Sequence, residues 1–145
     1  MRTFSFLLAA AFIISGCASV QRTLSYPATY ADADVWVGGH EYAVWFHESD
    51  PTILIQRGPP QQMGQALAQN LTMYAADQTE PEIYWRTAAN GVLQQIGCEA
   101  AEITGADQMR EVVYRCMEGV DVAAAVAQHR EQWRQGVRMD DPAGR

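Results

Sequence analysis

Three cysteines carry the most distinctive potential chemistry in this 145-residue chain. Cys17 directly follows an apolar segment, whereas Cys98 and Cys116 lie far downstream. A cysteine thiolate is a nucleophile and a metal ligand. However, the sequence contains no Cys-x-x-Cys pair and no companion histidines that would indicate a redox or metal function for Cys98 and Cys116. The first cysteine and the later pair therefore need separate explanations.

The segment before Cys17 has the layout of a secretory signal peptide. Residues 1–3 are short and positively charged, residues 4–14 are apolar apart from Ser5, and Ser15-Gly16 places small residues before the cysteine. A helix that spans a membrane needs about 20 apolar residues. The apolar run is shorter than that, so the segment is interpreted as a signal peptide that is removed from the mature protein.

The sequence Ile14-Ser15-Gly16-Cys17 resembles the lipobox of bacterial lipoproteins. The resemblance implies cleavage before Cys17 and acylation, with palmitate for example, of its sulfur and its new amino group. Durable anchoring needs two membrane signals, which multiple acyl chains supply. The next residue is Ala18 and not the aspartate that signals inner-membrane retention in enteric lipoproteins. The resemblance therefore implies anchoring at the periplasmic face of the outer membrane.

An exported chain enters an oxidising compartment, where disulfides persist. Residues 99–115 are predicted to form a hairpin around a turn at residues 104–108. Pairing centred on Asp107 sets Cys98 opposite Cys116, with Cβ atoms about 4.5–5.5 Å apart. Slight adjustment brings this separation within the range of a disulfide. The sequence therefore predicts a structural disulfide between these two cysteines.

His40 and His47, with acidic residues beside them, suggest a metal site at first sight. Their odd separation on one predicted strand points the two side chains to opposite faces, about 23 Å apart along the strand. They therefore cannot share a metal ion. Residues 48–51 are better interpreted as a hairpin turn with an Asx-type contact from Asp50. We expect no metal and no cofactor.

The sequence does not assemble an evident catalytic centre. It has no Gly-x-Ser-x-Gly nucleophile elbow, and the serines after the signal lie in predicted tether or turn segments. Glu99, Glu102 and Glu111 could meet across the hairpin as paired carboxylates, although such residues ordinarily lie on a solvated face. No catalytic residue is assigned.

Two binding interpretations remain open. Six aromatic residues could form a groove for a glycan or peptide, although their spacing is more typical of a core: Trp36, Tyr42, Trp45, Phe46, Tyr84 and Trp85. The predicted strand at residues 52–57 could alternatively be a sheet edge that accepts a partner strand.

The composition disfavours nucleic-acid binding. The formal charge of the chain is −7, and removal of Arg2 with the signal peptide makes it −8. A nucleic-acid-binding domain needs a basic patch, which an acidic domain of this kind is poorly suited to provide. The residues from Cys17 onward are sufficient for one domain.

The expected fold class is α+β. An antiparallel sheet, made of an N-terminal three-strand meander and a C-terminal hairpin, carries two or three helices packed on it. The meander strands are predicted at residues 34–37, 40–47 and 52–57, with Tyr42, Val44 and Phe46 on one face and Ala43 and Trp45 on the other. The helices are predicted at residues 61–76 (with a strand at 71–74 as the alternative), at residues 80–96 (with a Thr79/Glu82 capping box, Pro81 in the first turn and a stop at Gly97) and at residues 121–135 (capped by Asp121).

The expected domain organisation follows from these elements. Residues 1–16 are the signal peptide, 17–31 the lipidated cysteine and a flexible tether, 32–136 a single domain and 137–145 a frayed tail. The sequence favours an outer-membrane lipoprotein that acts as a non-catalytic binding or adaptor module, with an envelope protein or peptidoglycan as partner. The alternative is a small cell-wall-active hydrolase that uses the carboxylates of the hairpin.

The lipobox interpretation makes a direct prediction. Mass spectrometry of the protein purified from native membranes should show acylated Cys17 as the first residue, because signal cleavage and acylation occur together in lipoproteins. The variant Cys17→Ser should lose membrane association. An intact Met1, or an unmodified cysteine in the membrane fraction, would contradict this interpretation.

Overall fold

The computed structural model describes residues 21–72, 80–106 and 108–144 and has an α+β fold. Within these residues, six strands form one sheet in the order β4-β5-β3-β2-β1-β6. The strands are β1 (Ala33–Val37), β2 (His40–Phe46), β3 (Thr52–Arg57), β4 (Cys98–Ala106), β5 (Met109–Cys116) and β6 (Val137–Met139). The helices are α2 (Met63–Thr72), α3 (Glu82–Leu93), the short 3-10 helix η1 (Gln94–Ile96) and α4 (Val122–Trp133). None of the helices in these residues is long and apolar enough to cross a membrane.

The predicted meander of β1, β2 and β3 is confirmed. Gly38 and Gly39 both have positive φ, as a two-residue turn between right-twisted strands requires. The side chains of β2 alternate between the two faces of the sheet, as predicted. Tyr42, Val44 and Phe46 belong to one buried cluster, and Ala43 and Trp45 belong to the other. The strand β3 lies between β2 and β5, so the interpretation of residues 52–57 as a free sheet edge is wrong.

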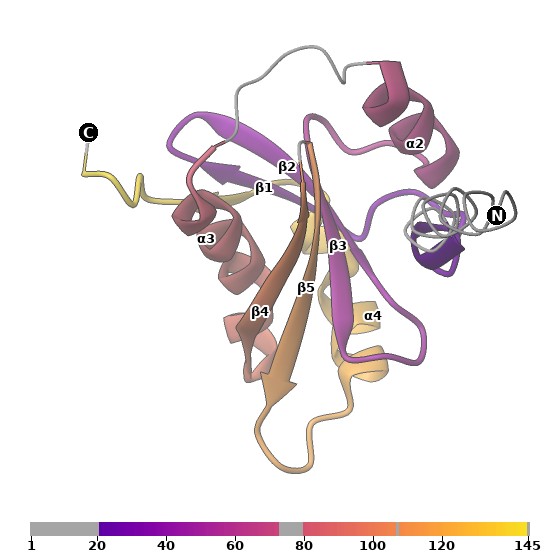
Figure 1. Ribbon diagram of the computed structural model, residues 1–145. Helices are drawn as coiled ribbons and strands as arrows, with labels where there is room; N and C mark the ends of the chain where they lie inside the picture. Colours follow the sequence, from indigo (N-terminus) through magenta and orange to yellow (C-terminus); the bar gives the residue numbers. More distant parts are fainter. Residues whose placement is uncertain (1–20, 73–79, 107, 145) are drawn as a thin grey trace, which may run out of the picture.

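Both faces of the sheet are covered, which explains why its central strands are apolar on both sides. The larger core lies between the sheet and the pair α3 and α4, and it includes Trp85, Leu93 and Trp133. The smaller core lies on the other face, where α2 and the residues before β1 pack on Trp45 and Leu54. Figure 1 shows α2 and α3 on opposite sides of the strands.

The helix α3 has the predicted apolar stripe and the predicted end. Its inward residues are all buried, and Gly97 ends the helical segment with a φ of 75°. The predicted capping box is wrong, because Pro81 is the N-cap residue and makes no side-chain capping bond. Glu82 instead binds Arg86 one turn later, at 2.7 Å. Thr79 lies outside the described residues.

The two other predicted helices also form. For residues 61–76 the prediction of a helix is confirmed as far as the structure describes them, because α2 spans Met63–Thr72. Residues 73–79 lie outside the described residues. Asp121 caps α4 as predicted, because its Oδ1 accepts a hydrogen bond from the Ala124 amide at 3.0 Å. This cap satisfies a helix donor that has no intrahelical partner.

The β4–β5 hairpin pairs Cys98 with Cys116, as predicted, and a disulfide joins them. The turn is tighter than expected. The strand β4 runs on to Ala106, which pairs with Met109. A bulge between Ala100 and Glu102 shifts the register by one residue, so the cysteines stay opposed although the hairpin no longer centres on one residue. A bulge of this kind leaves no clear periodic signal in the sequence.

The outer edge of β4 is partly occupied by side chains from α3. The Ala100 amide donates to Asn90 Oδ1 at 2.9 Å, and the Ala100 carbonyl accepts from the Arg86 guanidinium at 3.1 Å. These contacts satisfy main-chain groups that an edge strand otherwise presents to solvent.

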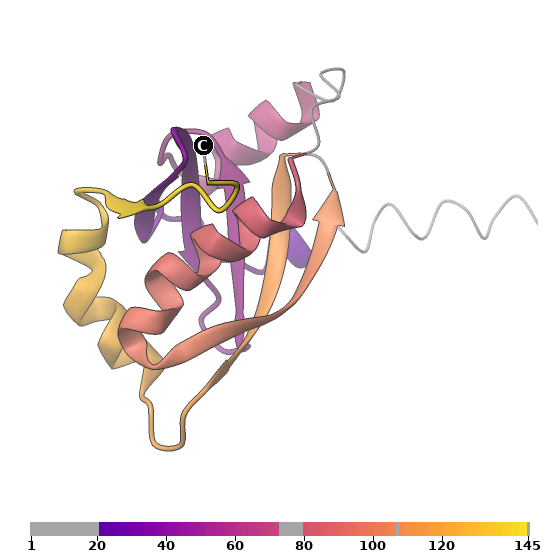
Figure 2. The ribbon, with the colours of Figure 1, turned by 90° about the vertical axis from the view of Figure 1, so that its left-hand side faces the viewer.

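The strand β6 corrects two predictions. It pairs parallel to β1, so the sheet is mixed and not purely antiparallel. It also occupies residues 137–139, which we expected to fray. Gly136, with a φ of 110°, lies at the turn between α4 and β6, and after this turn β6 pairs with the otherwise free edge of β1. Figure 2 shows β6 beside β1. Three residues are too short to produce a strand pattern in the sequence.

The hairpin predicts the effect of losing the disulfide. The variant Cys98→Ala is expected to lower the free energy of unfolding by about 2–4 kcal/mol, because the bridge limits the unfolded chain. Denaturant unfolding under non-reducing conditions measures this loss. Adding reductant should lower the stability of the parent protein and leave the variant unchanged. Free, alkylatable thiols at both positions in the folded parent would contradict the bridge.

Candidate functional site

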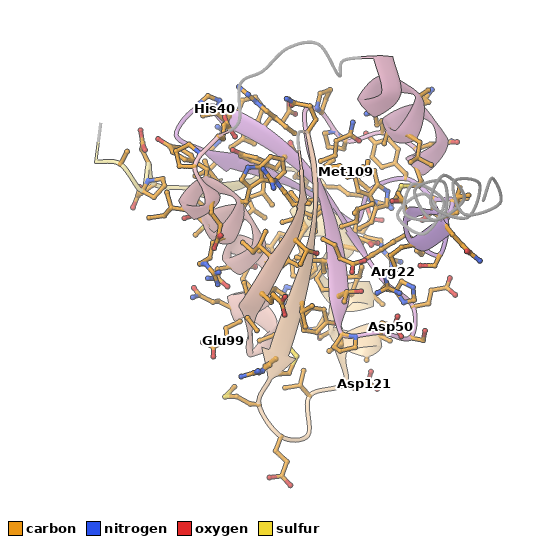
Figure 3. The ribbon with its side chains drawn as sticks, in the orientation of Figure 1. Arg22, His40, Asp50, Glu99, Met109 and Asp121 are labelled. Atoms are coloured by element: carbon orange, nitrogen blue, oxygen red, sulfur yellow. A yellow bond between two sulfur atoms is a disulfide. The ribbon has the colours of Figure 1, made fainter. Side chains whose placement is uncertain are left out.

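A cleft of about 1130 Å³ opens at one end of the sheet. One wall is the β2–β3 turn, residues 47–51, and the opposite wall is α4 with Asp121 before it. The end of β5 and two residues of the N-terminal segment, Pro27 and Thr29, complete the lining. Figure 3 shows Asp50 and Asp121 toward this end of the sheet and His40 toward the other.

The floor of the cleft is apolar and aromatic. It includes Phe46, Tyr114 and Val126, which belong to the larger core. The Phe46 ring stacks on Trp133, with centroids 5.8 Å apart, and meets Tyr114 at an angle. Tyr114 is only 5% exposed, and its hydroxyl has no hydrogen-bond partner among the described residues. Burial raises the pKa of Tyr114, so the hydroxyl stays a neutral donor at physiological pH.

Asp32 is the most deeply buried acid in the lining, with an exposed fraction of 5%. One carboxylate oxygen accepts the Phe46 amide at 2.9 Å, and the other accepts Arg130 Nε at 2.8 Å. Arg134, one turn further along α4, donates to the Ala31 carbonyl at 2.8 Å and lies over the Tyr30 ring. These contacts fasten α4 to the residues just before β1.

The role of these two arginines was not predicted from the sequence. Asp32 and Arg130 are 98 positions apart, and an arginine that looks solvent-exposed on a helix face is the ordinary case. The pattern Arg130-x-x-x-Arg134 placed two guanidinium groups on one face of α4. Together with an aspartate just before a strand, that spacing was the available signal.

Residues 17–31 were predicted to be a flexible tether, and residues 21–31 differ from this prediction because they are bonded to the sheet. Arg22 donates to Asp50 at 2.6 Å and to Glu111 at 2.8 Å, and it also reaches Thr52 at 3.0 Å. The buried Tyr26 hydroxyl lies 2.9 Å from the same threonine and 2.9 Å from the same glutamate, so that it can donate its proton to the carboxylate and accept one from the Thr52 hydroxyl. The segment is therefore a packed part of the domain. A short stretch without periodicity resembles a flexible linker in sequence even when two side chains anchor it.

Arg22 and Asp50 each stabilise the charged form of the other. The hydrogen bond from Arg22 holds the pKa of Asp50 below its usual range, and the same bond raises the pKa of Arg22. Burial, more than any other cause, raises the pKa of Tyr26. Arg22 and Asp50 therefore remain a charged pair at neutral pH, beside a tyrosine that remains protonated.

The β2–β3 turn forms at the predicted position with a different contact. His47 Nδ1 accepts the amides of Asp50 and Ser49 at 3.0 and 3.3 Å, so the histidine closes the turn. The Asp50 carboxylate, predicted to make an Asx-type turn, binds Arg22 instead. Because Nδ1 accepts hydrogen bonds, the ring proton lies on Nε2, which is 3.0 Å from the Ser25 hydroxyl.

His40 lies in a separate cluster. Its Nδ1 is 3.0 Å from Glu80, whose carboxylate also lies 3.3 Å from Arg57 and accepts the Tyr42 hydroxyl. His40 meets the ring of Tyr84 on the α3 side, whereas His47 meets Tyr26 on the other face. The two histidines therefore face opposite sides of the sheet, as their spacing predicts.

The predicted carboxylate group and aromatic groove do not form. Glu111 is bound by Arg22 and Tyr26, and Glu99 and Glu102 are exposed on β4. None of the three lines the cleft. Of the six aromatic residues considered, only Trp36 is partly exposed, and it packs under Arg138. The other five are buried in the two cores: Tyr42, Trp45, Phe46, Tyr84 and Trp85.

Comparisons of the chain with protein-family models, with curated proteins and with solved structures found no match. The cleft is therefore interpreted from its own residues.

The anchoring of residues 21–31 can be tested by substitution. The variant Arg22→Gln is expected to expose Tyr26, which is 3% exposed, because Glu111 and Asp50 lose their cation. The Tyr26–Pro27 bond resists chymotrypsin, but the enzyme should then cleave after Leu24 or Tyr30 in the loosened segment, at concentrations that leave the parent intact. The free energy of unfolding should fall only slightly, because the Arg22–Asp50 ion pair is largely solvated. Arg86→Gln, which removes an exposed helix pair, is the control and should not promote this cleavage.

The lowered pKa of Asp50 predicts a pH-dependent stability difference. An acid whose pKa is lowered by folding stabilises the protein above its unfolded pKa, about 4. That stabilisation disappears as the pH falls through the lowered folded value. The parent should therefore have a higher Tm than Asp50→Asn at pH 7, and the gap should close in acid. A gap that persists unchanged to the lowest accessible pH would contradict the pairing.

Proposed function

We propose that this protein is a lipid-anchored binding module of the bacterial cell envelope, which holds a partner in the cleft between the β2–β3 turn and α4. In this proposal, Cys17 is the acylated residue and the outer membrane is the site of anchoring. The partner is an envelope protein or peptidoglycan, and the domain acts by binding without turnover.

The observation that supports binding most directly is the cleft itself. A ligand site is commonly a concave surface with an apolar lining and a few oriented polar groups. This cleft combines an aromatic floor, Phe46 and Tyr114, with charged side chains on both walls. Its volume of about 1130 Å³ suits a peptide or sugar segment.

The position of residues 21–31 supports a role close to the membrane. Arg22 is already fixed to the sheet, so only residues 18–21 separate it from Cys17. Even fully extended, the chain from Cys17 to Arg22 reaches about 18 Å. An acylated Cys17 would therefore hold the end of the domain that carries Arg22, and with it the cleft wall at Asp50, near the lipid surface.

An exposed apolar side chain lies on the same segment. Leu24, two residues after Arg22, is 64% exposed. An exposed leucine by itself needs no explanation. Next to a lipid anchor, however, it would contact the interface and add to the attachment. Short reach and a nearby apolar side chain both support a domain that stays at the membrane.

Site-specific photo-crosslinking in intact cells tests the binding role. Ala123 and Gln128 are both exposed on α4, but only Ala123 lines the cleft. A benzophenone amino acid at Ala123 is expected to give a discrete crosslinked product, because a bound partner lies within its reach. The same group at Gln128 is the matched control and should give much less.

The anchor provides the second control for this experiment. Combining the Ala123 crosslinker with Cys17→Ser should reduce the product, because loss of the tether lowers the local concentration of the partner. Equal products from Ala123 and Gln128, or none from either, would contradict binding in the cleft.

A further inference from the structure

We propose that His47 makes the β2–β3 turn sensitive to pH: protonation of its Nδ1 breaks the two hydrogen bonds that close residues 47–51, and this wall of the cleft then moves. The change in the turn follows from the contacts of His47 alone. Its effect on a bound partner rests on the proposed binding function, because all five residues of the turn line the cleft.

The neutral ring of His47 is bonded on both sides. Its Nδ1 accepts the Asp50 amide at 3.0 Å and the Ser49 amide at 3.3 Å. Its Nε2 lies 3.0 Å from the Ser25 hydroxyl, which donates to a carbonyl and can therefore accept the Nε2 proton. The side chain is only 8% exposed, and the Tyr26 ring meets it edge to face with centroids 4.9 Å apart. The ring is therefore held with Nδ1 toward the turn.

Protonation changes Nδ1 from an acceptor into a donor. An imidazolium ring carries a proton on both nitrogens, so the new N–H of His47 would point at the amide N–H groups of Ser49 and Asp50. Three donors then meet without an acceptor among them. The two amides must find other acceptors, and the turn cannot keep its conformation when they do. The Nε2 proton is present in both charge states, so the contact with Ser25 does not oppose this change.

Asp50 offers the protonated ring a different partner. Its Oδ2 lies 3.8 Å from Nδ1, which is too far for a hydrogen bond, and the same oxygen accepts Arg22 at 2.6 Å. The hydrogen bond from Arg22 holds the pKa of Asp50 below its usual range. The carboxylate is therefore still charged in mild acid, and a movement of the turn brings it to the imidazolium. The turn thus has one set of partners for each charge state of His47.

Histidine is the side chain whose charge ordinarily changes between about pH 5 and 8, whereas carboxylates and guanidinium groups ordinarily titrate outside that range. The groups that face His47 from the N-terminal segment and β5 are Arg22, Tyr26 and Glu111, and burial raises the pKa of Tyr26. The other charged residues of the cleft are carboxylates and guanidinium groups: Asp32, Glu48, Arg115, Asp121, Arg130, Glu131 and Arg134. The two other histidines of the chain, His40 and His129, do not line the cleft.

The N-terminal segment stays in place when the turn moves. Arg22 keeps its bonds to Glu111 and Thr52, and the Tyr26 hydroxyl keeps its contacts with the same two residues. The movement is therefore confined to the turn, and one wall of the cleft changes its position relative to α4. A partner that fits the neutral arrangement should bind less well in mild acid.

Nuclear magnetic resonance of the intact mature lipoprotein, labelled with nitrogen-15 and held in a non-ionic detergent, tests the turn. At about pH 7.5, the ring-nitrogen resonances of His47 should show the tautomer with its proton on Nε2. On titration to about pH 5, Nδ1 should gain a proton. The amide-proton resonances of Ser49 and Asp50 should move upfield with the same midpoint, because these amides lose their acceptor.

Two variants separate His47 from other titrating groups. His47→Asn places a carbonyl oxygen near the position of Nδ1, so it can accept the turn amides but cannot gain a proton. In this variant, the amide resonances of Ser49 and Asp50 should change little with pH. His129→Gln removes a histidine that stacks on Trp133 outside the cleft, and its turn should respond to pH as in the parent.

Crosslinking from Ala123 in isolated membranes tests the effect on the cleft. The yield of the crosslinked product should fall about threefold or more between about pH 7.5 and about pH 5 in the parent. In His47→Asn the yield should be the same at both pH values, because the turn no longer titrates. The crosslinker at Gln128 gives the background at each pH.

Several results would overturn the inference. They are a proton on Nδ1 at neutral pH, amide shifts that do not follow the titration of His47, and the same shifts in His47→Asn. A turn that responds to pH while the yield at Ala123 stays constant would show that His47 does not regulate the cleft. Absence of a product at either pH contradicts the proposed binding function instead, and the resonance spectra then decide by themselves whether the turn responds to pH.

Discussion

Asp32 is the residue on which the arrangement of the domain most depends. A carboxylate that is nearly withdrawn from water costs several kcal/mol unless strong hydrogen bonds replace its hydration. Here one oxygen binds the backbone of β2 at Phe46, and the other binds Arg130 of α4. The cost can therefore be met only when the residues before β1, the end of β2 and α4 are all in place. Without α4, the charge would be buried and unpaired.

The cleft is a consequence of the same constraint. Because Arg130 and Arg134 hold α4 against residues 30–32, the helix lies at the end of the larger core and leaves a gap toward the β2–β3 turn. On the other side of the sheet, Arg22 holds that turn through Asp50. The two walls are thus positioned by separate ion pairs, and each pair includes a residue from the segment just before β1.

The parts of the fold that were predicted correctly are those with repeated local signals. The meander alternated along β2, α3 had an apolar stripe with Gly97 at its end, and the cysteines were opposed across a hairpin. The errors share a different cause. The parallel strand β6, the packed residues 21–31 and the bonds of Asp32 all depend on contacts between distant segments, and three residues or one ion pair carry no periodicity. The cleft could not be predicted, because its lining comes from four separate parts of the chain.

The side chains of α3 that reach the edge of β4 have a further consequence. Molecules confined to a membrane surface meet each other far more often than molecules in solution, and an unprotected strand at the end of a sheet is a template for unwanted association. Asn90 and Arg86 occupy the amide and the carbonyl of Ala100, next to the bulge that already disturbs the strand. A neighbouring copy would have to displace both side chains before its own backbone could pair there. If the protein is crowded on a lipid surface, this edge would help it to remain a separate monomer.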